Sequence, residues 1–320
     1  MTERKDPLVT IGIPTFNRAG NYLRQALECA VNQTYPNIEI IVSDNCSTDQ
    51  TEALVENFSS PRIKYHRHNH NIGAINNFNY CLEQAEGRYF LLLHDDDMID
   101  PDLIDSCIKA LGNQIETGVI ITGTRIVDGN GKVISEIPNR LQHCSTTDFF
   151  QGWFSSQVAL YLCSTLYNTK RLKELGGFKS KTNLFLDVIA TAKLAGLYGR
   201  IDVHEVKANF RRHESNMGGN PDKVNAWAED SLFLLAVMCD LVSTNEEKKR
   251  IFQDGNLFLA KKNYRLCSTI KSPLTRLISY CRAYKMFGYK FSPVSFWYHQ
   301  YVIRYLKSAT NKTKRLVSEW

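Results

Sequence analysis

The sequence predicts an α/β domain, built on a mostly parallel sheet with helices on both faces, followed by a helical extension. Three observations carry this prediction. Short apolar runs alternate with segments of helical periodicity in the first part of the chain. Polar clusters directly follow several of those runs, and from about residue 222 the pattern is helical and aromatic with few strand signals. Alternating strands and helices are typical of a parallel sheet that is covered on both faces.

The alternating elements follow one another in order. Residues 8–13 and 38–42 are apolar runs, the first ended by Pro14 and the second by Ser43-Asp44-Asn45, as expected of buried strands. Residues 22–31 have helical spacing, and Ser47-Thr48-Asp49-Gln50 resembles a capping box that opens a helix through Phe58. The same criteria predict strands at 63–66, 89–93 and 119–122, helices at 78–85 and 101–111, and a hairpin turn at 128–131. The later part of the sheet should therefore be mixed.

Length and composition limit the class of protein. A chain of 320 residues can bury one large core plus an appendage, and its 43% hydrophobic and 22% charged residues exclude collagen-like and disordered classes. The chain starts without a basic and apolar leader, and no apolar run approaches the ~20 residues of a membrane span, so we expect neither export nor a transmembrane helix. Nine scattered cysteines without a C-x-x-C pair argue against a disulfide framework and a zinc site, which fits the cytoplasm.

Polar side chains are predicted at the carboxyl ends of the strands, where ligands of such sheets bind. The strongest cluster is Asp95-Asp96-Asp97, which follows an apolar strand. Three adjacent carboxylates repel one another without a cation, and hard divalent ions such as Mg²⁺ are shared between carboxylates and substrate phosphates. The triplet therefore predicts a metal and a diphosphate ligand, with a solvated acidic turn as the alternative.

Four motifs in the same order resemble family 2 glycosyltransferases with the GT-A fold. They are residues 9–18, Gln33-Thr34-Tyr35-Pro36, residues 39–49, and Gly87-Arg88-Tyr89 ahead of the acidic triplet, which supplies a D-x-D motif. The resemblance covers about residues 8–215. It implies a Rossmann-like GT-A catalytic domain over residues 1–221, with a nucleotide-sugar half (1–123) and an acceptor half (124–221). The resemblance does not cover residues 222–320, which the residue pattern itself predicts to be a basic aromatic helical tail.

The resemblance also implies roles for residues of the donor site. The implied donor-binding residues are Pro14, Thr15, Asn17, Asp44, Asn45, Asp95 and Arg211. The implied metal-binding residues are Asp96, Asp97 and His213, which would hold Mn²⁺ or Mg²⁺ against the donor phosphates and assist departure of the nucleotide. The family more often has Asp where this chain has Asn45, and often an Arg near Asn76, so the identity of the base stays open. A simple turn remains the alternative for Asp44 and Asn45, and an exposed basic strand end for Arg211 and His213.

A general base is needed because an acceptor alcohol is a poor nucleophile until its proton is removed. In the family this base is an Asp shortly after a Gly-Gly-Phe turn, and here Gly176-Gly177-Phe178 precedes Asp187. Leu186 departs from the usual Glu. A single base opposite the leaving group implies inversion at the anomeric carbon. The alternative is that Asp187 only caps the helix that follows.

The function implied by the resemblance is transfer of a sugar from a nucleotide-sugar donor, by default a UDP-sugar, to a hydroxyl of a cell-surface glycan or lipid-linked precursor. A nicotinamide dehydrogenase is excluded because Gly12-Ile13-Pro14-Thr15 does not match G-x-G-x-x-G. A nucleotidyltransferase would need a glycine-rich triphosphate loop, which the sequence lacks. The open alternative is a non-catalytic sugar- or nucleotide-binding protein descended from such an enzyme.

The tail is strongly basic. Residues 248–320 contain sixteen Lys and Arg against two carboxylates, a net charge of +14, which leaves −8 on the first 247 residues. Trp297, Tyr301 and Tyr305 fall on one helical face, flanked by Arg304 and Lys307. Two hypotheses are open: the tail binds an anionic membrane at the inner face of the cell membrane, or it packs on the catalytic domain or on a twin subunit as a homo-oligomer. We expect no nucleic-acid partner, because the acidic half carries the site.

Overall fold

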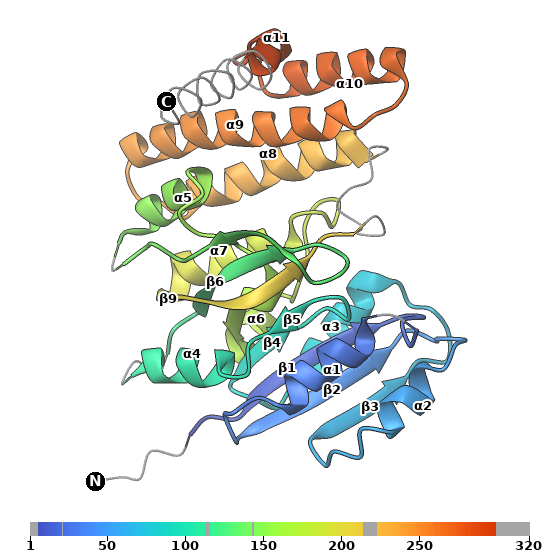
Figure 1. Ribbon diagram of the computed structural model, residues 1–320. Coiled ribbons are helices and arrows are strands. Elements are labelled where there is room, and N and C mark those ends of the chain that lie inside the picture. Colours follow the sequence, from blue (N-terminus) through green and yellow to red (C-terminus); the bar gives the residue numbers. More distant parts are fainter. Residues whose placement is uncertain (1–5, 21, 113–115, 143, 214–222, 299–320) are drawn as a thin grey trace, which may run out of the picture.

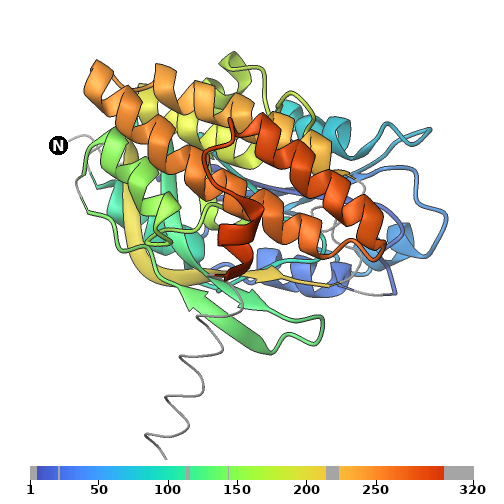
Figure 2. The ribbon, with the colours of Figure 1, turned by 90° about the horizontal axis from the view of Figure 1, so that it is seen from above.

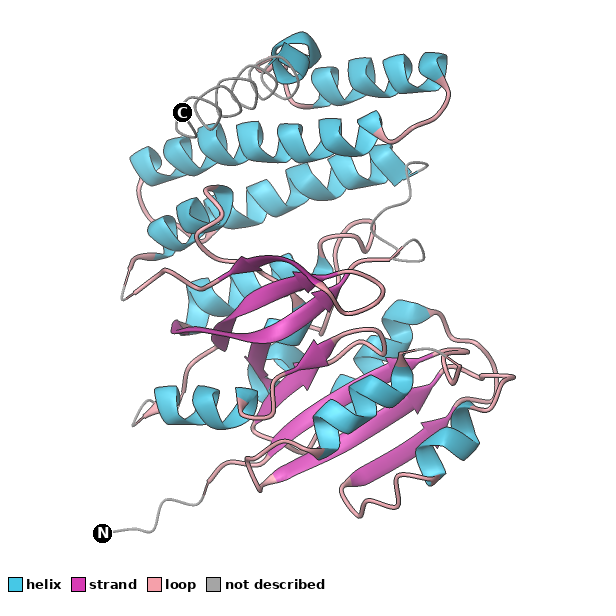
Figure 3. Cartoon of the chain, viewed as in Figure 1, coloured by secondary structure: helices cyan, strands magenta, loops and turns pink. Residues whose placement is uncertain are grey.

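The computed structural model describes residues 6–20, 22–112, 116–142, 144–213 and 223–298. In Figure 1 an α/β layer forms the lower part of the molecule and a stack of long helices forms the upper part. The strands form one nine-stranded sheet, in the order β3-β2-β1-β4-β8-β6-β9-β5 with β7 paired to β6. Figure 3 shows this sheet as a central layer with helices on both sides, which confirms the predicted fold class.

The first half of the sheet is parallel, as predicted. Its strands are β1 (Val9–Thr15), β2 (Ile38–Asp44), β3 (Ile63–Arg67) and β4 (Tyr89–Leu92), and the helices beside them are α1 (Leu23–Val31), α2 (Thr51–Glu56), α3 (Ala74–Gln84) and α4 (Leu103–Leu111). Strands β1 and β2 are buried along their whole length, which explains why they are continuous apolar runs. Thr15 pairs with Asp44, so the two strands end at the same level and their loops meet.

The second half of the sheet is mixed, also as predicted. It contains β5 (Met98–Ile99), β6 (Val119–Val127), β7 (Val133–Ile137), β8 (Thr165–Asn168) and β9 (Arg200–Arg211), with α5 (Thr146–Phe154), η1 (Leu162–Ser164), α6 (Thr169–Glu174) and α7 (Leu186–Tyr198). β8 is antiparallel to β4 and β6, whereas β9 runs parallel to β6. The expected boundary at 123/124 falls inside β6, so the two halves share one sheet.

One local prediction was wrong. The residues Ser47-Thr48-Asp49-Gln50 do not form a capping box, because Gln50 is the N-cap of α2 and its side chain makes no capping hydrogen bond. Ser47 instead donates to Asp44, and Asp49 accepts from the backbone of Ala19 and from Thr51. These short polar side chains hold the loops at the ends of β1 and β2 together. A complete capping box does occur at Thr244 and Glu247.

The C-terminal part is helical, as predicted, and packs on the α/β domain. It consists of α8 (Val224–Asp240), α9 (Asn245–Ser268), α10 (Pro273–Met286) and α11 (Pro293–Trp297), which lie side by side across the top of the molecule (Figures 1 and 2). Trp153 of α5 and Leu259 of α9 belong to one hydrophobic core. Tyr280, Phe287 and Phe296 are buried in the same core.

The described part of the tail, residues 223–298, therefore packs on the α/β domain, and binding of the tail to a membrane stays a prediction. The predicted Tyr301 and Tyr305, with Arg304 and Lys307, lie outside the described residues, as does the predicted domain boundary at 221/222. Among the helices that the structure describes, none combines the length and apolarity needed to cross a bilayer.

Candidate functional site

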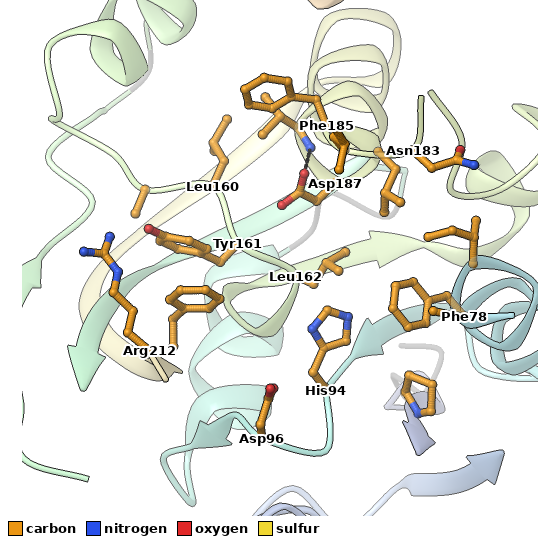
Figure 4. Close-up of a pocket in the computed structure, with 18 of the residues that line it drawn as sticks. Phe78, His94, Asp96, Leu160, Tyr161, Leu162, Asn183, Phe185, Asp187 and Arg212 are labelled. Carbon is orange, nitrogen blue, oxygen red and sulfur yellow. Dashed lines mark hydrogen bonds between the residues drawn. The ribbon is translucent and has the colours of Figure 1, made fainter. Parts of the chain in front are cut away.

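A cavity of about 700 Å³ lies between the carboxyl ends of the parallel strands and the helical layer. Its size is in the range of small-molecule sites, and its lining residues range from Pro14 to Arg265. The charged and polar lining residues include Thr15, Arg18, Asn45, His94, Asp95, Asp96, Tyr161, Asp187, Arg212, Lys262 and Arg265. In Figure 4, Asp96 and His94 lie on one side of the cavity, and Asp187 lies on the other. Predicted site residues from both halves of the domain therefore meet around one space.

Four of the predicted donor-binding residues line this cavity: Pro14, Thr15, Asn45 and Asp95. The side-chain amide of Asn45 donates to Asn71 at 2.9 Å, and its oxygen accepts from the backbone of Ile72 at 2.8 Å. These bonds fix Asn45 against the loop before α3 and hold its position beside the end of β1. The side chain is thus pre-oriented at the cavity wall.

Asp44 and Asn17 do not line the cavity. Asp44 is fully buried, and its carboxylate accepts from Ser47 and from the hydroxyl of Tyr65. Asn17 has a positive φ of 54° and accepts from the backbone of Thr48 at 2.8 Å. Both side chains stabilise the loops that carry Thr15 and Asn45. For Asp44 this matches the alternative interpretation from the sequence, in which the residue forms a turn. Direct contact of either with a donor stays a prediction.

The acidic triplet is not a solvated turn, because the side chains of Asp95 and Asp96 are only 13% and 14% exposed. Burial, with repulsion from Asp96, raises the pKa of Asp95 to about 7, although Arg18 lies 4.0 Å away. Asp97 is 2% exposed, and burial raises its pKa well above the ordinary value. Three carboxyl groups forced together out of water favour a bound cation.

The residues around the triplet fit a divalent metal ion. Ligand atoms of His94, Asp96 and Asp97 all lie within 4.8 Å of one another. Nε2 of His94 is buried without a hydrogen-bond partner, and burial lowers the pKa of this imidazole, which keeps it neutral as a ligand must be. The predicted His213 places its Nε2 2.8 Å from Oδ2 of Asp96. His94 is a metal-site candidate that the sequence reasoning missed, although its position directly before the triplet was a signal.

Arg211 lies outside the cavity, whereas a side chain that clamps the donor phosphates would have to reach into it. It is 1% exposed and does not line the cavity; its guanidinium donates to the backbone oxygens of Asp96 and Gly129 and stacks over Tyr22 at 4.3 Å. Its backbone amide donates to Asp97. Arg211 therefore holds the acidic loop in place, and the neighbouring Arg212 reaches the cavity instead (Figure 4). A donor contact of Arg211 stays a prediction.

Asp187 lines the cavity from the first turn of α7. The N-cap of α7 is Phe185, so Asp187 lies within the first turn, where it satisfies one backbone amide and also lines the cavity. Its Oδ1 accepts from the backbone of Val188 at 2.8 Å, drawn in Figure 4. Burial raises the pKa of Asp187 to about 6, against the lowering effects of Val188 and the Lys262 ammonium. A carboxylate with this pKa is poised to accept a proton near neutral pH.

Asp230 of α8 holds the loop that leads to Asp187. Four groups donate to its carboxylate: the hydroxyl of Ser180 and the backbone amides of Thr182, Leu184 and Phe185. Asp230 is fully buried, which would raise its pKa, but these hydrogen bonds outweigh burial and lower it. The helical layer thus positions the start of α7, a role that no sequence pattern indicated.

We expect Asp230→Asn to destabilise the fold by about 1–3 kcal/mol, since at least one buried donor loses its acceptor. Displacing the start of α7 should also lower turnover by up to about 10²-fold. Thermal unfolding and steady-state kinetics check both effects, and the affinity for the donor nucleotide should not change. Glu229→Gln is the matched control, because Glu229 contacts the same loop through an exposed ion pair with Lys181 at 3.3 Å. Equal effects of the two substitutions would contradict the positioning role.

Comparison with known proteins identifies the family of this chain. Residues 10–176 match the family model described as "Glycosyl transferase family 2", which spans just over half of the chain. A curated relative from Campylobacter jejuni, named GalNAc(5)-diNAcBac-PP-undecaprenol beta-1,3-glucosyltransferase, is 30% identical over 52% of this chain and 55% of its own length. Alignments with uncharacterised glycosyltransferases from three Rickettsia species cover only 20% to 38% of those relatives.

Two solved structures share the fold. S. aureus TarS 1–349, solved with UDP-GlcNAc, has a TM-score of 0.60 at 18% identity over 91% of both chains. The mannosyltransferase PcManGT from Pyrobaculum calidifontis, solved with GDP-Man and Mn²⁺, has a TM-score of 0.57 at 18% identity, covering 88% of this chain and 76% of its own. At this level of identity the likeness concerns the fold.

Proposed function

This chain belongs to glycosyl transferase family 2 and has the GT-A fold, and from that premise we propose that it transfers a sugar from a nucleotide-sugar donor to an acceptor hydroxyl. The observation that supports this most directly is the single cavity that joins the acidic triplet to Asp187 (Figure 4). A diphosphate leaving group needs positive charge on one side of the reacting carbon. The acceptor hydroxyl needs a base on the other side.

On the donor side, the nucleotide occupies the end of the cavity beside Pro14, Thr15 and Asn45. The fixed amide of Asn45 offers a donor and an acceptor to a base or ribose, with Asp95 facing the ribose. A UDP-sugar is the proposed donor, in keeping with the UDP-GlcNAc complex of TarS.

His94, Asp96 and Asp97 would hold a divalent cation. His213, which contacts the carboxylate of Asp96, would complete this group of ligands. Such a cation supplies neutralising charge to the departing diphosphate. We propose Mn²⁺ rather than Mg²⁺, because Mg²⁺ prefers oxygen ligands and this set includes imidazole nitrogen. Arg211 keeps this loop in place, because its guanidinium donates to the backbone oxygen of Asp96 and its backbone amide donates to the carboxylate of Asp97.

On the acceptor side, Asp187 removes the proton from the attacking hydroxyl. The acceptor oxygen then attacks the anomeric carbon from the face opposite the diphosphate, the bond to the diphosphate breaks, and Asp187 keeps the proton. One displacement gives the inverted anomer. Buried surroundings and Asp230 hold Asp187 in the geometry that this step requires.

The proposed acceptor is a cell-envelope glycan or its lipid-linked precursor. The undecaprenyl diphosphate in the name of the Campylobacter relative supports a lipid-linked acceptor. We place the enzyme in the cytoplasm at the inner face of the membrane, where the +14 charge of residues 248–320 would be attracted to anionic lipid.

The experiment that tests the proposed function is a panel of nucleotide sugars incubated with the protein and Mn²⁺, with released nucleotide as the readout. We expect one donor to release nucleotide slowly by hydrolysis and faster when the correct acceptor is present. Nucleotide binding without release from any donor and acceptor would instead favour a non-catalytic descendant of the family.

The pH dependence of transfer should report Asp187. The pKa of its carboxyl is about 6, with burial and Asp230 raising it and Lys262 lowering it. Because the ionised form is the base, turnover should fall about tenfold per pH unit as the pH drops below 6 and level off above it. The profile of kcat measures this limb, and UDP affinity measured over the same range separates it from titration of Asp95. A flat kcat from pH 4.5 to 7.5 would contradict the role of Asp187.

A further inference from the structure

Helix α9 carries two cations into the Asp187 end of the cavity. Lys262 and Arg265 both line it. They are three residues apart on the helix and therefore share one face. Both belong to the part of the chain outside the family match, which ends at residue 176.

These two cations are not neutralised within the described protein. Neither side chain forms an ion pair or donates a hydrogen bond to another residue that the structure describes. The ammonium of Lys262 lies 5.5 Å from the ring centre of Trp153, 5.3 Å from Phe185 and 5.8 Å from Phe258. An aromatic ring attracts a cation less strongly than a carboxylate or phosphate does.

Lys262 is an exposed residue whose ammonium faces the cavity. The surrounding protein lowers the pKa of this ammonium to about 8, despite the nearby Asp187. An anion in the cavity would favour its charged form.

The charge balance at this end favours an anionic ligand. Arg212, Lys262 and Arg265 face the cavity there, against the single carboxylate of Asp187. The partly exposed Trp227 also lines the cavity and offers apolar surface, which suits the C–H face of a sugar ring. Cations beside aromatic rings form a site for a sugar that bears a negative group.

We propose that this end of the cavity is an acceptor subsite for a glycan that carries an oxyanion, bound by Lys262 and Arg265. The proposal rests on the proposed function, because it takes the Asp187 end as the acceptor side. The oxyanion is a carboxylate of a uronic acid or a phosphate ester on the acceptor. Both chemistries suit an ammonium and a guanidinium side by side.

The test compares three small probes: methyl glucuronide, glycerol 3-phosphate, and neutral methyl glucoside. Binding to the full chain loaded with UDP and Mn²⁺ is followed by saturation-transfer NMR, with tryptophan fluorescence as a second readout. We expect one of the two anions to bind at least about tenfold more tightly than methyl glucoside, since a charge-assisted hydrogen bond contributes that much. Whether the carboxylate or the phosphate binds identifies the source of the oxyanion.

The double variant K262Q/R265Q should lose this preference while its affinity for UDP and Mn²⁺ stays unchanged. Lys261→Gln is the matched control, because Lys261 is the adjacent cation of α9, lies over Phe291 at 5.2 Å and does not line the cavity. If the change at Lys262 unfolds the protein, Arg265→Gln alone, at an exposed position, provides the comparison.

The proposal is overturned by no preference for either anion in the unmodified protein, by an unchanged preference in the double variant, or by an equal loss in Lys261→Gln. A fall in UDP affinity in the double variant would also overturn it, because the cations would then serve the donor. Failure of the unmodified protein to bind UDP with Mn²⁺ at all would count against the proposed function itself, so the two failures are distinguishable.

Discussion

Asp187→Asn should lower the turnover of sugar transfer by about 10²–10⁴-fold, the range that a positioned general base supplies. Asparagine has nearly the same shape, and its oxygen can still accept from the backbone of Val188. The amide cannot take up a proton from the acceptor hydroxyl. The start of α7 and the donor side of the cavity should therefore keep their structure while the chemical step slows.

The measurement is kcat under saturating donor and acceptor, together with UDP affinity by calorimetry. The acid limb of the pH profile near 6 should disappear in the variant. Asp148→Asn is the matched control, because Asp148 also lies in the first turn of a helix, α5, but is exposed and away from the cavity. Near-normal turnover of Asp187→Asn, or NMR couplings that show a retained anomer in the product, would refute the assignment.

Asp96→Ala should remove the dependence of UDP binding on Mn²⁺. In the unmodified protein, UDP affinity should be much higher with Mn²⁺ than without, because the buried triplet otherwise repels the diphosphate. Mutation of a residue that only supports a metal ligand typically lowers metal affinity by ~10–100-fold. Loss of the proposed ligand Asp96 itself should weaken Mn²⁺ binding by at least that much. Sugar transfer should be lost with it.

Calorimetric titration of UDP into dialysed protein, with and without Mn²⁺, makes this measurement, and titration of Mn²⁺ alone gives a readout that does not depend on activity. His94→Gln and His213→Gln compare the two imidazoles near Asp96. Asp105→Asn is the control, since Asp105 is paired with Lys109 on α4 and does not line the cavity. Equal UDP affinity with and without Mn²⁺ in the unmodified protein would contradict the metal site.

The extent of sequence-based prediction varies across the site. Thr15, Asn45 and Asp96 were placed at the cavity because polar residues directly after buried strands must lie at the carboxyl edge of a parallel sheet. The same reasoning does not distinguish Asn45, which lines the cavity, from Asp44, which is buried in the turn. Adjacent side chains point in different directions, and only the packing around them decides which one meets the ligand.

By itself, the sequence determined the α/β order, the mixed second half of the sheet, the helical C-terminal part and the family, because periodicity, turn residues and motifs are local. The tertiary structure alone decided that Arg211 is buried behind the triplet while Arg212 faces the cavity, and that His94 lies beside Asp96. It also decided that α8 holds the loop before Asp187 through Asp230, and that α9 lines the cavity through Lys262. Helical periodicity predicts that a face is buried, but the partner of that face is set by contacts between segments far apart in the chain.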